Sequence, residues 1–181
     1  MCSGGAPLYS DVKHFITAVF STPIFEAYGQ TESSGNCACT NFWERKAGHV
    51  GGILPCIRMQ VREVPHLNTD TSAVCPRGEL FIKGNSVMVG YFKDPELTDI
   101  MLDKDGWFRV GDLVVVLPNG SIQIIDRVKE FKKLQNGQFI APQKLETIYL
   151  NAPLVHQVCI EVNPKYCHLV AVVTVNQYKV Q

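Results

Sequence analysis

Short apolar segments, broken by glycine and proline, occupy the middle of this 181-residue chain and limit most strongly what it can fold into. Runs of β-favouring residues recur at residues 59–64, 79–83, 112–117 and 121–126. The last two runs flank Pro-Asn-Gly at residues 118–120, which predicts a β-hairpin because Asn-Gly suits a tight turn. We therefore expect a β-rich unit over residues 48–126.

Helical patterns lie before and within this unit. A helix is predicted over residues 10–21, where Ser10 or Asp11 can cap the first turn. Its apolar residues recur at helical spacing and are Val12, Phe15, Ile16, Val19 and Phe20. A second, short helix is predicted to begin after Asp94, because the proline that follows suits the first helical position.

The character of the chain changes near residues 126–130, where we expect a domain boundary. Beyond it the patterns predict a charged segment, a turn, a helix and two strands, at residues 127–133, 135–137, 142–150, 157–162 and 168–175. About fifty residues are few for an independent core, so the chain is expected to end inside a domain.

Composition excludes several classes of protein. Hydrophobic residues make up 46% and charged residues 19%, which is typical of a globular chain and not of a disordered one. Lys and Arg together number 17, as do Asp and Glu, so the charge does not call for nucleic acid. No apolar run approaches the roughly 20 residues that span a bilayer. Of seven cysteines only Cys37 and Cys39 are close together, a poor zinc signature, which favours reduced thiols in a cytosolic protein.

Residues 28–32, Tyr-Gly-Gln-Thr-Glu, follow an apolar segment and carry groups suited to a nucleotide. Tyr28 can stack on a planar base, and Gly29 permits a tight turn. Thr31 offers a hydroxyl to a phosphate, and Glu32 offers a hard oxygen ligand to Mg²⁺. Taken alone, an ordinary turn with surface polar residues explains this segment better.

Four further segments follow in order, at residues 78–84, 90–91, 106–112 and 125–130. They read Gly-Glu-Leu-Phe-Ile-Lys-Gly, Gly-Tyr, Gly-Trp-Phe-Arg-Val-Gly-Asp and Ile-Asp-Arg-Val-Lys-Glu. Their order and spacing resemble the motifs of adenylate-forming (AMP-binding) enzymes, which include acyl-CoA synthetases, luciferases and adenylation domains of peptide synthetases. Longer strings at residues 3–8, 48–51, 126–131 and 141–146 are most similar to long-chain fatty acyl-CoA synthetases.

The resemblance implies a mixed α/β fold in two parts. Residues 1–126 would form the end of the large adenylation domain, with a β-barrel-like subdomain over about residues 48–126. Residues 127–181 would form the hinge and the first part of a small α/β C-terminal domain.

The resemblance also implies an activity for the full-length protein. A fatty acid and Mg²⁺-bound ATP would give acyl-adenylate and pyrophosphate, and coenzyme A would then displace AMP to give acyl-CoA. We expect no nucleic-acid partner. We expect a cytoplasmic protein, and the resemblance allows peripheral association of the whole protein with an intracellular membrane.

Roles in the first part follow from the resemblance, residue by residue. Gly5 and Ala6 would lie against the adenine, and Tyr28 would stack on it. Thr31 would bond the α-phosphate and Glu32 would hold Mg²⁺. Asp112 would accept hydrogen bonds from the ribose hydroxyls, although it could also simply cap a turn.

Three roles fall in the second part. Arg127 would contact the ribose, although without the motif a surface ion pair would be the favoured reading. Lys129 would act at the hinge, or would belong to a merely solvated charged linker. The loop around Gly137 would help to face the coenzyme A tunnel.

Two departures bear on activity. The family usually has Thr where this chain has Val110, so one polar contact near the nucleotide, worth about 1 kcal/mol, would be missing. The phosphate loop and the C-terminal lysine of the family are not found, so these residues alone are expected to be an inactive fragment. The alternatives are a natural non-catalytic relative that binds a nucleotide or a partner, and a ligase for an aromatic or shorter acid.

Overall fold

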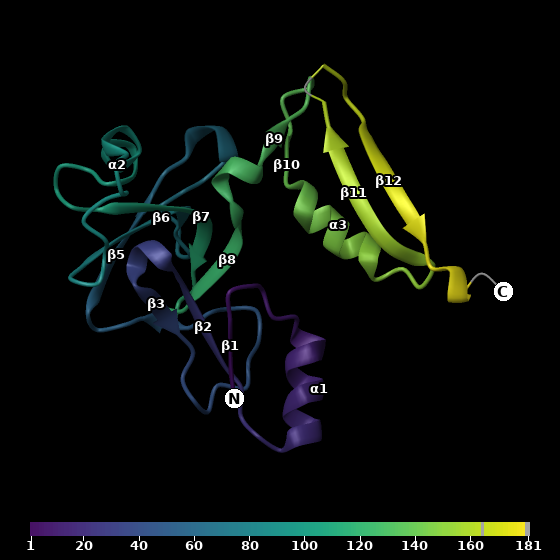
Figure 1. The fold of residues 1–181 in the computed structure, drawn as a ribbon, viewed down its shortest axis with the longest axis horizontal. Coiled ribbons are helices and arrows are strands. Elements are labelled where there is room, and N and C mark those ends of the chain that lie inside the picture. Colours follow the sequence, from purple (N-terminus) through teal and green to yellow (C-terminus); the bar gives the residue numbers. More distant parts are fainter. Residues whose placement is uncertain (164, 180–181) are drawn as a thin grey trace. The chain divides into compact units, whose positions relative to one another are not determined.

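The computed structural model describes residues 1–163 and 165–179, which form two compact units, Met1–Ile125 and Asp126–Gln181 (Figure 1). We call them the first and second unit and describe each by itself. They divide between Ile125 and Asp126, next to the boundary expected at residues 126–130.

The first sheet of the first unit has the order β1-β2-β3-β4, with β1 Cys2–Gly4, β2 Phe25–Gln30, β3 Gly35–Cys39 and β4 Gly52–Ile53. β1 runs parallel to β2, and α1 (Ser10–Phe20) connects them as a β-α-β unit. The other neighbouring strands are antiparallel. Because parallel strands end at the same edge, the residues that follow β1 and β2 lie at one edge of this sheet.

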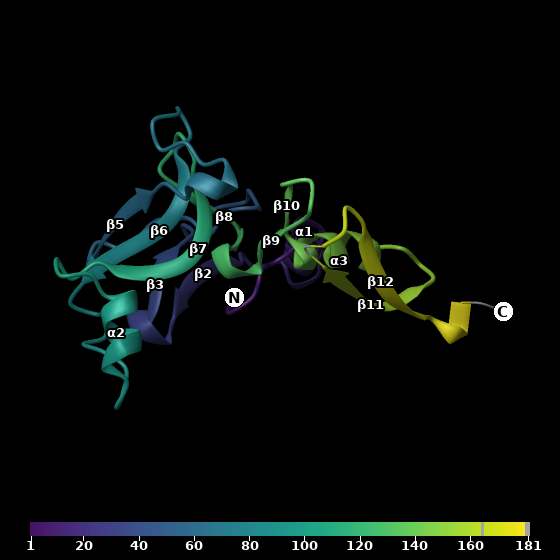
Figure 2. The ribbon, with the colours of Figure 1, turned by 90° about the horizontal axis from the view of Figure 1, so that it is seen from above.

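The second sheet has the order β5-β6-β7-β8, with β5 Ile57–Arg62, β6 Arg77–Gly84, β7 Phe108–Val116 and β8 Ile122–Arg127. Figure 2 shows β5, β6 and β7 side by side. The predicted strands are all present, and the predicted hairpin turn is confirmed: the Gly120 N–H donates to Leu117 O (2.8 Å) with Gly120 at φ +80°. The sheet is open, and the described residues contain no closed barrel.

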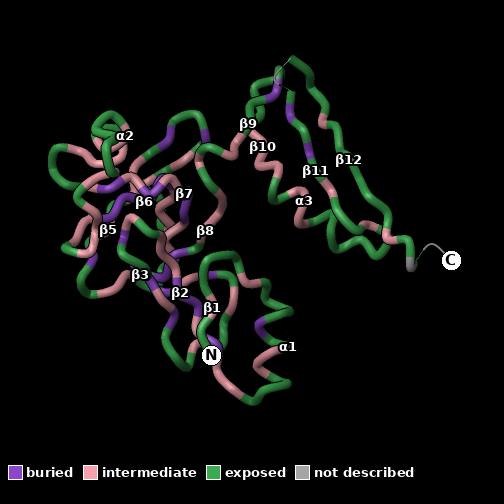
Figure 3. Tube along the Cα trace, in the orientation of Figure 1, coloured by how far each residue is buried: buried purple, intermediate pink, exposed green. Residues whose placement is uncertain are grey.

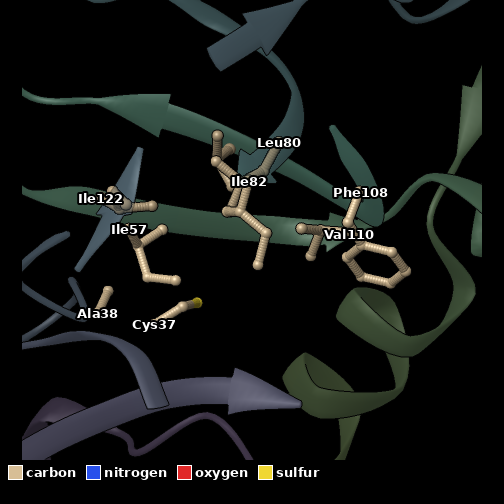
Figure 4. Packing of buried hydrophobic residues seen from close by; sticks show 9 residues of the cluster. Cys37, Ala38, Ile57, Leu80, Ile82, Phe108, Val110 and Ile122 are labelled. Carbon is tan, nitrogen blue, oxygen red and sulfur yellow. The ribbon is translucent and has the colours of Figure 1, made fainter. Parts of the chain in front are cut away.

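The core of the first unit lies between the two sheets (Figure 4). Cys37 and Ala38 of β3 face residues of the second sheet there, and Figure 4 shows Ile57 and Ile82 pointing toward Cys37. The other buried members are Leu80, Phe108, Val110, Val114 and Ile122. Phe108 is fully buried in this cluster. This apolar layer holds the sheets together, because apolar burial is the main favourable contribution to folding.

Helix α1 differs from its prediction. Most of α1 is exposed or half-buried, with one buried segment (Figure 3). On its apolar face Phe15 is 67% and Val19 57% accessible, while Lys13 is only 2% accessible. Lys13 Nζ donates to Glu26 Oε1 (2.9 Å) and to Lys46 O (2.8 Å), so an ion pair attaches the helix to β2. The predicted capping by Ser10 or Asp11 is also wrong, since the cap residue is Tyr9 and makes no side-chain capping bond.

Short helices connect the strands of the first unit. α2 (Pro95–Met101) begins as predicted, with the Asp94 carboxylate accepting the Leu97 N–H (3.0 Å). Two 3-10 turns, η1 (Thr31–Ser33) and η2 (Pro65–Leu67), follow β2 and β5 and had no predicted counterpart. Such single turns have little sequence signal because they lack a repeating apolar pattern.

The second unit is small. It contains η3 (Val128–Glu130), β9 (Lys132–Lys133), β10 (Phe139–Ile140), α3 (Pro142–Leu150), β11 (Val155–Val162), β12 (Leu169–Val175) and η4 (Gln177–Lys179). β11 and β12 form a hairpin, and β11 packs against α3, where Glu146 Oε1 accepts the Ile160 N–H (2.7 Å). Ile160 and Val162 of β11 form a buried cluster with Leu134, which lies between β9 and β10. The predicted helix is therefore confirmed, as are both strands, which begin at slightly different residues.

The cysteines are free thiols, as expected for a reduced protein. Burial raises the pKa of Cys37 to about 11, so this thiol stays protonated at neutral pH and behaves as a small apolar residue. Within the described ranges, no helix combines the length and the hydropathy needed to cross a bilayer.

Candidate functional site

The residues that follow β1 and β2 meet at one edge of the first sheet. The pairing of Gly4 with Ala27 places Gly5 and Ala6 beside the end of β2. A Cβ on Gly4 would lie 2.8 Å from Ala27 O, and Gly5 has φ +85°. Small residues are therefore required here by the backbone itself, and they leave both Gly5 and Ala6 exposed at the edge.

The turn after β2 presents Thr31 and Glu32. Ser33 Oγ donates to Gly35 O (2.6 Å) and accepts the Gln30 N–H (3.1 Å), so η1 is fixed from inside. Thr31 is exposed and Glu32 partly exposed, as a phosphate or metal contact would need.

Gly29 has a different role from the predicted one. It lies within β2, beside a register shift between β2 and β3, and not in a turn. A Cβ at this position would lie 1.9 Å from Gly35 O. Glycine is therefore required by the close approach of β3.

Tyr28 and Asp112 connect the two sheets. The Tyr28 hydroxyl donates to Asp112 Oδ2, and Gln30 Nε2 donates to Val110 O (3.5 Å). Asp112 is 8% accessible and lies inside β7, so the alternative that it caps a turn is wrong.

A bulge in β7 explains how Asp112 reaches the first sheet. The register with β6 shifts between Glu79 and Phe81, so residues 110–112 oppose Leu80 alone. Gly111 has φ +84°, a conformation that glycine adopts without strain. Bulges of this kind bend a strand and redirect its side chains.

Glu32 has one side-chain partner in the described residues. The Tyr91 hydroxyl donates to Glu32 Oε1 (2.9 Å). Burial, and then the hydrogen bond to Glu32, raises the pKa of Tyr91 to about 12, so the phenol remains a donor at neutral pH. Sequence reasoning noted Gly-Tyr at residues 90–91 as a motif but assigned Tyr91 no role.

Glu32 fits a magnesium ion that arrives with a nucleotide better than a resident metal centre. The described residues hold no group of three His, Cys, Asp or Glu side chains that could bind a metal. Mg²⁺ commonly uses one or two carboxylates together with substrate phosphates and water. A single carboxylate beside the exposed Thr31 meets that requirement.

The remaining predicted residues lie in the second unit. Arg127 ends β8 and is exposed, and its backbone N–H donates to Asp126 Oδ1 (2.7 Å). Lys129 lies in η3 and is exposed. Gly137 occupies the predicted turn, with φ +86° and its N–H bonded to Leu134 O (2.9 Å). Their ribose, hinge and coenzyme A roles stay predictions.

Two hollows lie elsewhere in the first unit, with volumes of about 320 and 530 Å³. None of the predicted site residues lines them. His49 borders the smaller one and is buried, with Nδ1 accepting the Gly51 N–H (3.1 Å).

Comparison with known proteins identifies the family and the fold. The family model described as "AMP-binding enzyme" matches residues 1–92. The chain is 42% identical to mouse "Long-chain-fatty-acid--CoA ligase 5" and 40% identical to human "Long-chain-fatty-acid--CoA ligase 1". Each alignment covers 96% of this chain but only 25% and 24% of the relative, so the chain spans about a quarter of their length.

A solved structure has the same fold. It is the A domain of carboxylic acid reductase from Segniliparus rugosus, in complex with AMP and a carboxylic acid. The match has a TM-score of 0.81 and 32% sequence identity, and covers 98% of this chain and 27% of that one.

Proposed function

Since this chain belongs to the family of AMP-binding enzymes, we propose that it forms the nucleotide-binding part of a long-chain fatty acid–CoA ligase. One observation carries the proposal. The hydrogen bond between Tyr28 and Asp112 joins two of the predicted nucleotide residues at the edge where Gly5, Ala6 and Thr31 are exposed. The relatives named for this activity are about four times as long, so the activity is proposed for the protein of which such a segment is part.

The first unit would hold the adenosine. A carboxylate accepts hydrogen bonds at both oxygens, so Asp112 can bond ribose hydroxyls while Oδ2 still accepts from Tyr28. That bond also fixes the Tyr28 ring, on which an adenine can stack beside Gly5 and Ala6. Thr31 would donate to the α-phosphate.

Mg²⁺ bound by Glu32 would neutralise phosphate charge. The fatty acid carboxylate would attack the α-phosphate, giving acyl-adenylate and pyrophosphate. The coenzyme A thiol would then displace AMP. We assign Arg127 to the ribose, Lys129 to the hinge and Gly137 to the coenzyme A side, and we place the protein in the cytoplasm or peripherally on an intracellular membrane.

Both alternatives find less support. Curated relatives of this chain are named for long-chain or fatty acyl substrates, which opposes a ligase for an aromatic or shorter acid. A non-catalytic relative that binds a partner would need none of Thr31, Glu32 and Asp112, and one that binds only a nucleotide would not need the magnesium ligand proposed at Glu32. This chain has all three residues.

Calorimetric titration with AMP and with 2′,3′-dideoxy-AMP tests the ribose contact. We expect the wild-type chain to bind AMP more tightly than the dideoxy nucleotide. Asp112→Asn should weaken AMP binding about tenfold or more, since hydrogen bonds to charged groups contribute about 1.5–3 kcal/mol. It should also remove most of the preference for AMP.

Asp99→Asn is the matched control, because Asp99 is exposed on α2. It should leave both affinities unchanged. If Asp112→Asn keeps the full preference for AMP, Asp112 does not bind the ribose and the proposed site is wrong.

A further inference from the structure

The segment that follows β6 is fastened to the turn that carries Glu32. The Met88 N–H donates to Glu32 O (2.8 Å), and Ser34 Oγ donates to Ser86 O (2.8 Å). The Tyr91 hydroxyl donates to Glu32 Oε1 (2.9 Å). Residues 86–91 therefore bond both the backbone of this turn and its carboxylate.

Helix α2 holds Tyr91 in place from the other side. The Tyr91 N–H donates to Thr98 Oγ1 (2.9 Å), and that hydroxyl donates to Asp94 O (2.8 Å). A Cβ on Gly90 would lie 2.9 Å from Thr98 Cγ2, so glycine lets the segment approach the helix. The backbone of Tyr91 is thus fixed independently of its bond to Glu32.

We infer that Tyr91 is a positioning residue that holds the Glu32 carboxylate in the orientation in which it binds the magnesium ion of the bound nucleotide. The inference rests on the proposed function. Tyr91 donates to Oε1 of Glu32 and so fixes the plane of the carboxylate. The second oxygen, Oε2, has no hydrogen bond in the described residues and is left to bind the ion. Without the phenol, Glu32 rotates freely on an exposed turn and pays for its ordering when the ion binds.

Groups that hydrogen-bond a metal ligand without touching the metal commonly change metal affinity by about 10–100-fold when removed. Tyr91 has this relation to Glu32, and its bond spans 59 residues of sequence, which explains why the sequence alone did not connect the two. The motif Gly-Tyr at residues 90–91 thereby receives a function: it supplies a fixed phenol to the magnesium side of the site.

The test measures ATP binding by the full 181-residue chain as a function of Mg²⁺ concentration, with AMP binding in the absence of Mg²⁺ as the second readout. Tyr91→Phe should raise the Mg²⁺ concentration for half-maximal enhancement of ATP binding about tenfold and leave AMP binding unchanged. Glu32→Gln should remove most of the enhancement. In the Glu32→Gln background, Tyr91→Phe should have no further effect, because the phenol acts through the carboxylate.

Two variants complete the design. Tyr149→Phe removes an exposed hydroxyl in the second unit and should change nothing. Thr98→Val removes the acceptor of the Tyr91 N–H and should shift the Mg²⁺ dependence in the same direction as Tyr91→Phe, by a smaller factor. Thermal melting of each variant verifies that it is folded.

Contrary results separate the two proposals. If AMP binds but Tyr91→Phe leaves the Mg²⁺ dependence unchanged, the positioning role is overturned and the nucleotide site stands. A loss of AMP binding in Tyr91→Phe, or an equal effect in the Glu32→Gln background, shows a general structural role and also overturns it. If the wild-type chain binds neither nucleotide, the proposed function fails and the inference fails with it.

Discussion

The side chain of Val110 lies in the core and not at the nucleotide edge. It is 7% accessible and packs with Phe108 and Ile82, while only its backbone carbonyl faces the site residue Gln30. The missing threonine hydroxyl was expected to cost a polar contact near the nucleotide. In the structure, valine suits this position, because a threonine hydroxyl here would be buried among apolar side chains.

Val110→Thr should therefore lower the free energy of unfolding, by about 1–3 kcal/mol, the cost of an unsatisfied buried polar group. AMP affinity should not improve. Urea denaturation measures the change, and Val89→Thr, at a fully exposed position, is the control that should have no effect. A Val110→Thr variant that binds AMP more tightly at unchanged stability would contradict the core assignment.

Single residues also show where sequence reasoning succeeds. The hairpin turn at residues 118–120 and the cap at Asp94 depend on the conformational preferences of adjacent residues, so they can be predicted from the sequence. Tyr91 and the role of Gly29 depend on neighbours brought close by strand pairing. No local pattern reports such contacts.

At the scale of elements, α1 was predicted correctly as a helix but with the wrong face toward the sheet. Periodicity showed an apolar face, whereas the described residues leave Phe15 and Val19 exposed and bury Lys13. The partner that permits this burial, Glu26, lies on β2. Helical periodicity alone predicts that a lysine is exposed, because its charge is rarely buried without a partner.

Lys13→Met should destabilise the first unit by about 3–5 kcal/mol, because it leaves Glu26 buried without its counter-ion. Lys13→Met with Glu26→Leu should recover most of this loss. Thermal and urea unfolding measure both variants, with the exposed Lys104→Met as the control. Equal stability of the single and double variants would show that the ion pair does not hold α1.

Asp103, in the loop between α2 and β7, makes the stability of the fold depend on pH. The Trp107 N–H (2.8 Å), and then Arg62, hold the pKa of Asp103 below its ordinary value. A carboxyl group whose pKa is lowered by folding stabilises the protein above its unfolded pKa, near pH 4, and loses that contribution as the pH falls further.

Asp103→Asn should therefore reduce stability at pH 7 and flatten the loss of stability between pH 5 and pH 3. Unfolding by urea at a series of pH values measures this, and Asp105→Asn, which leaves the Asp103 carboxylate in place, is the comparison. Identical acid profiles for Asp103→Asn and the wild type would refute the assignment.

At the scale of the whole molecule, two units of unequal size share the predicted site residues. Gly5, Ala6, Tyr28, Thr31, Glu32 and Asp112 belong to the first unit, while Arg127, Lys129 and Gly137 belong to the second. The mixed α/β class, the order of strands along the chain and the ordered motifs were predictable, because each follows from periodicity or from resemblance. The bulge at residues 110–112 and the pairing of Tyr28 with Asp112 were not, because they arise from the packing of two sheets.

We propose that AMP binds at the edge where β1 and β2 end, across from the bulge in β7. Chemical-shift mapping of the isotope-labelled chain with AMP tests it most directly. We predict shifts concentrated at residues 4–6, 28–32 and 110–112, saturating together. Shifts confined to the hollow beside His49, or none at millimolar AMP, would contradict the account.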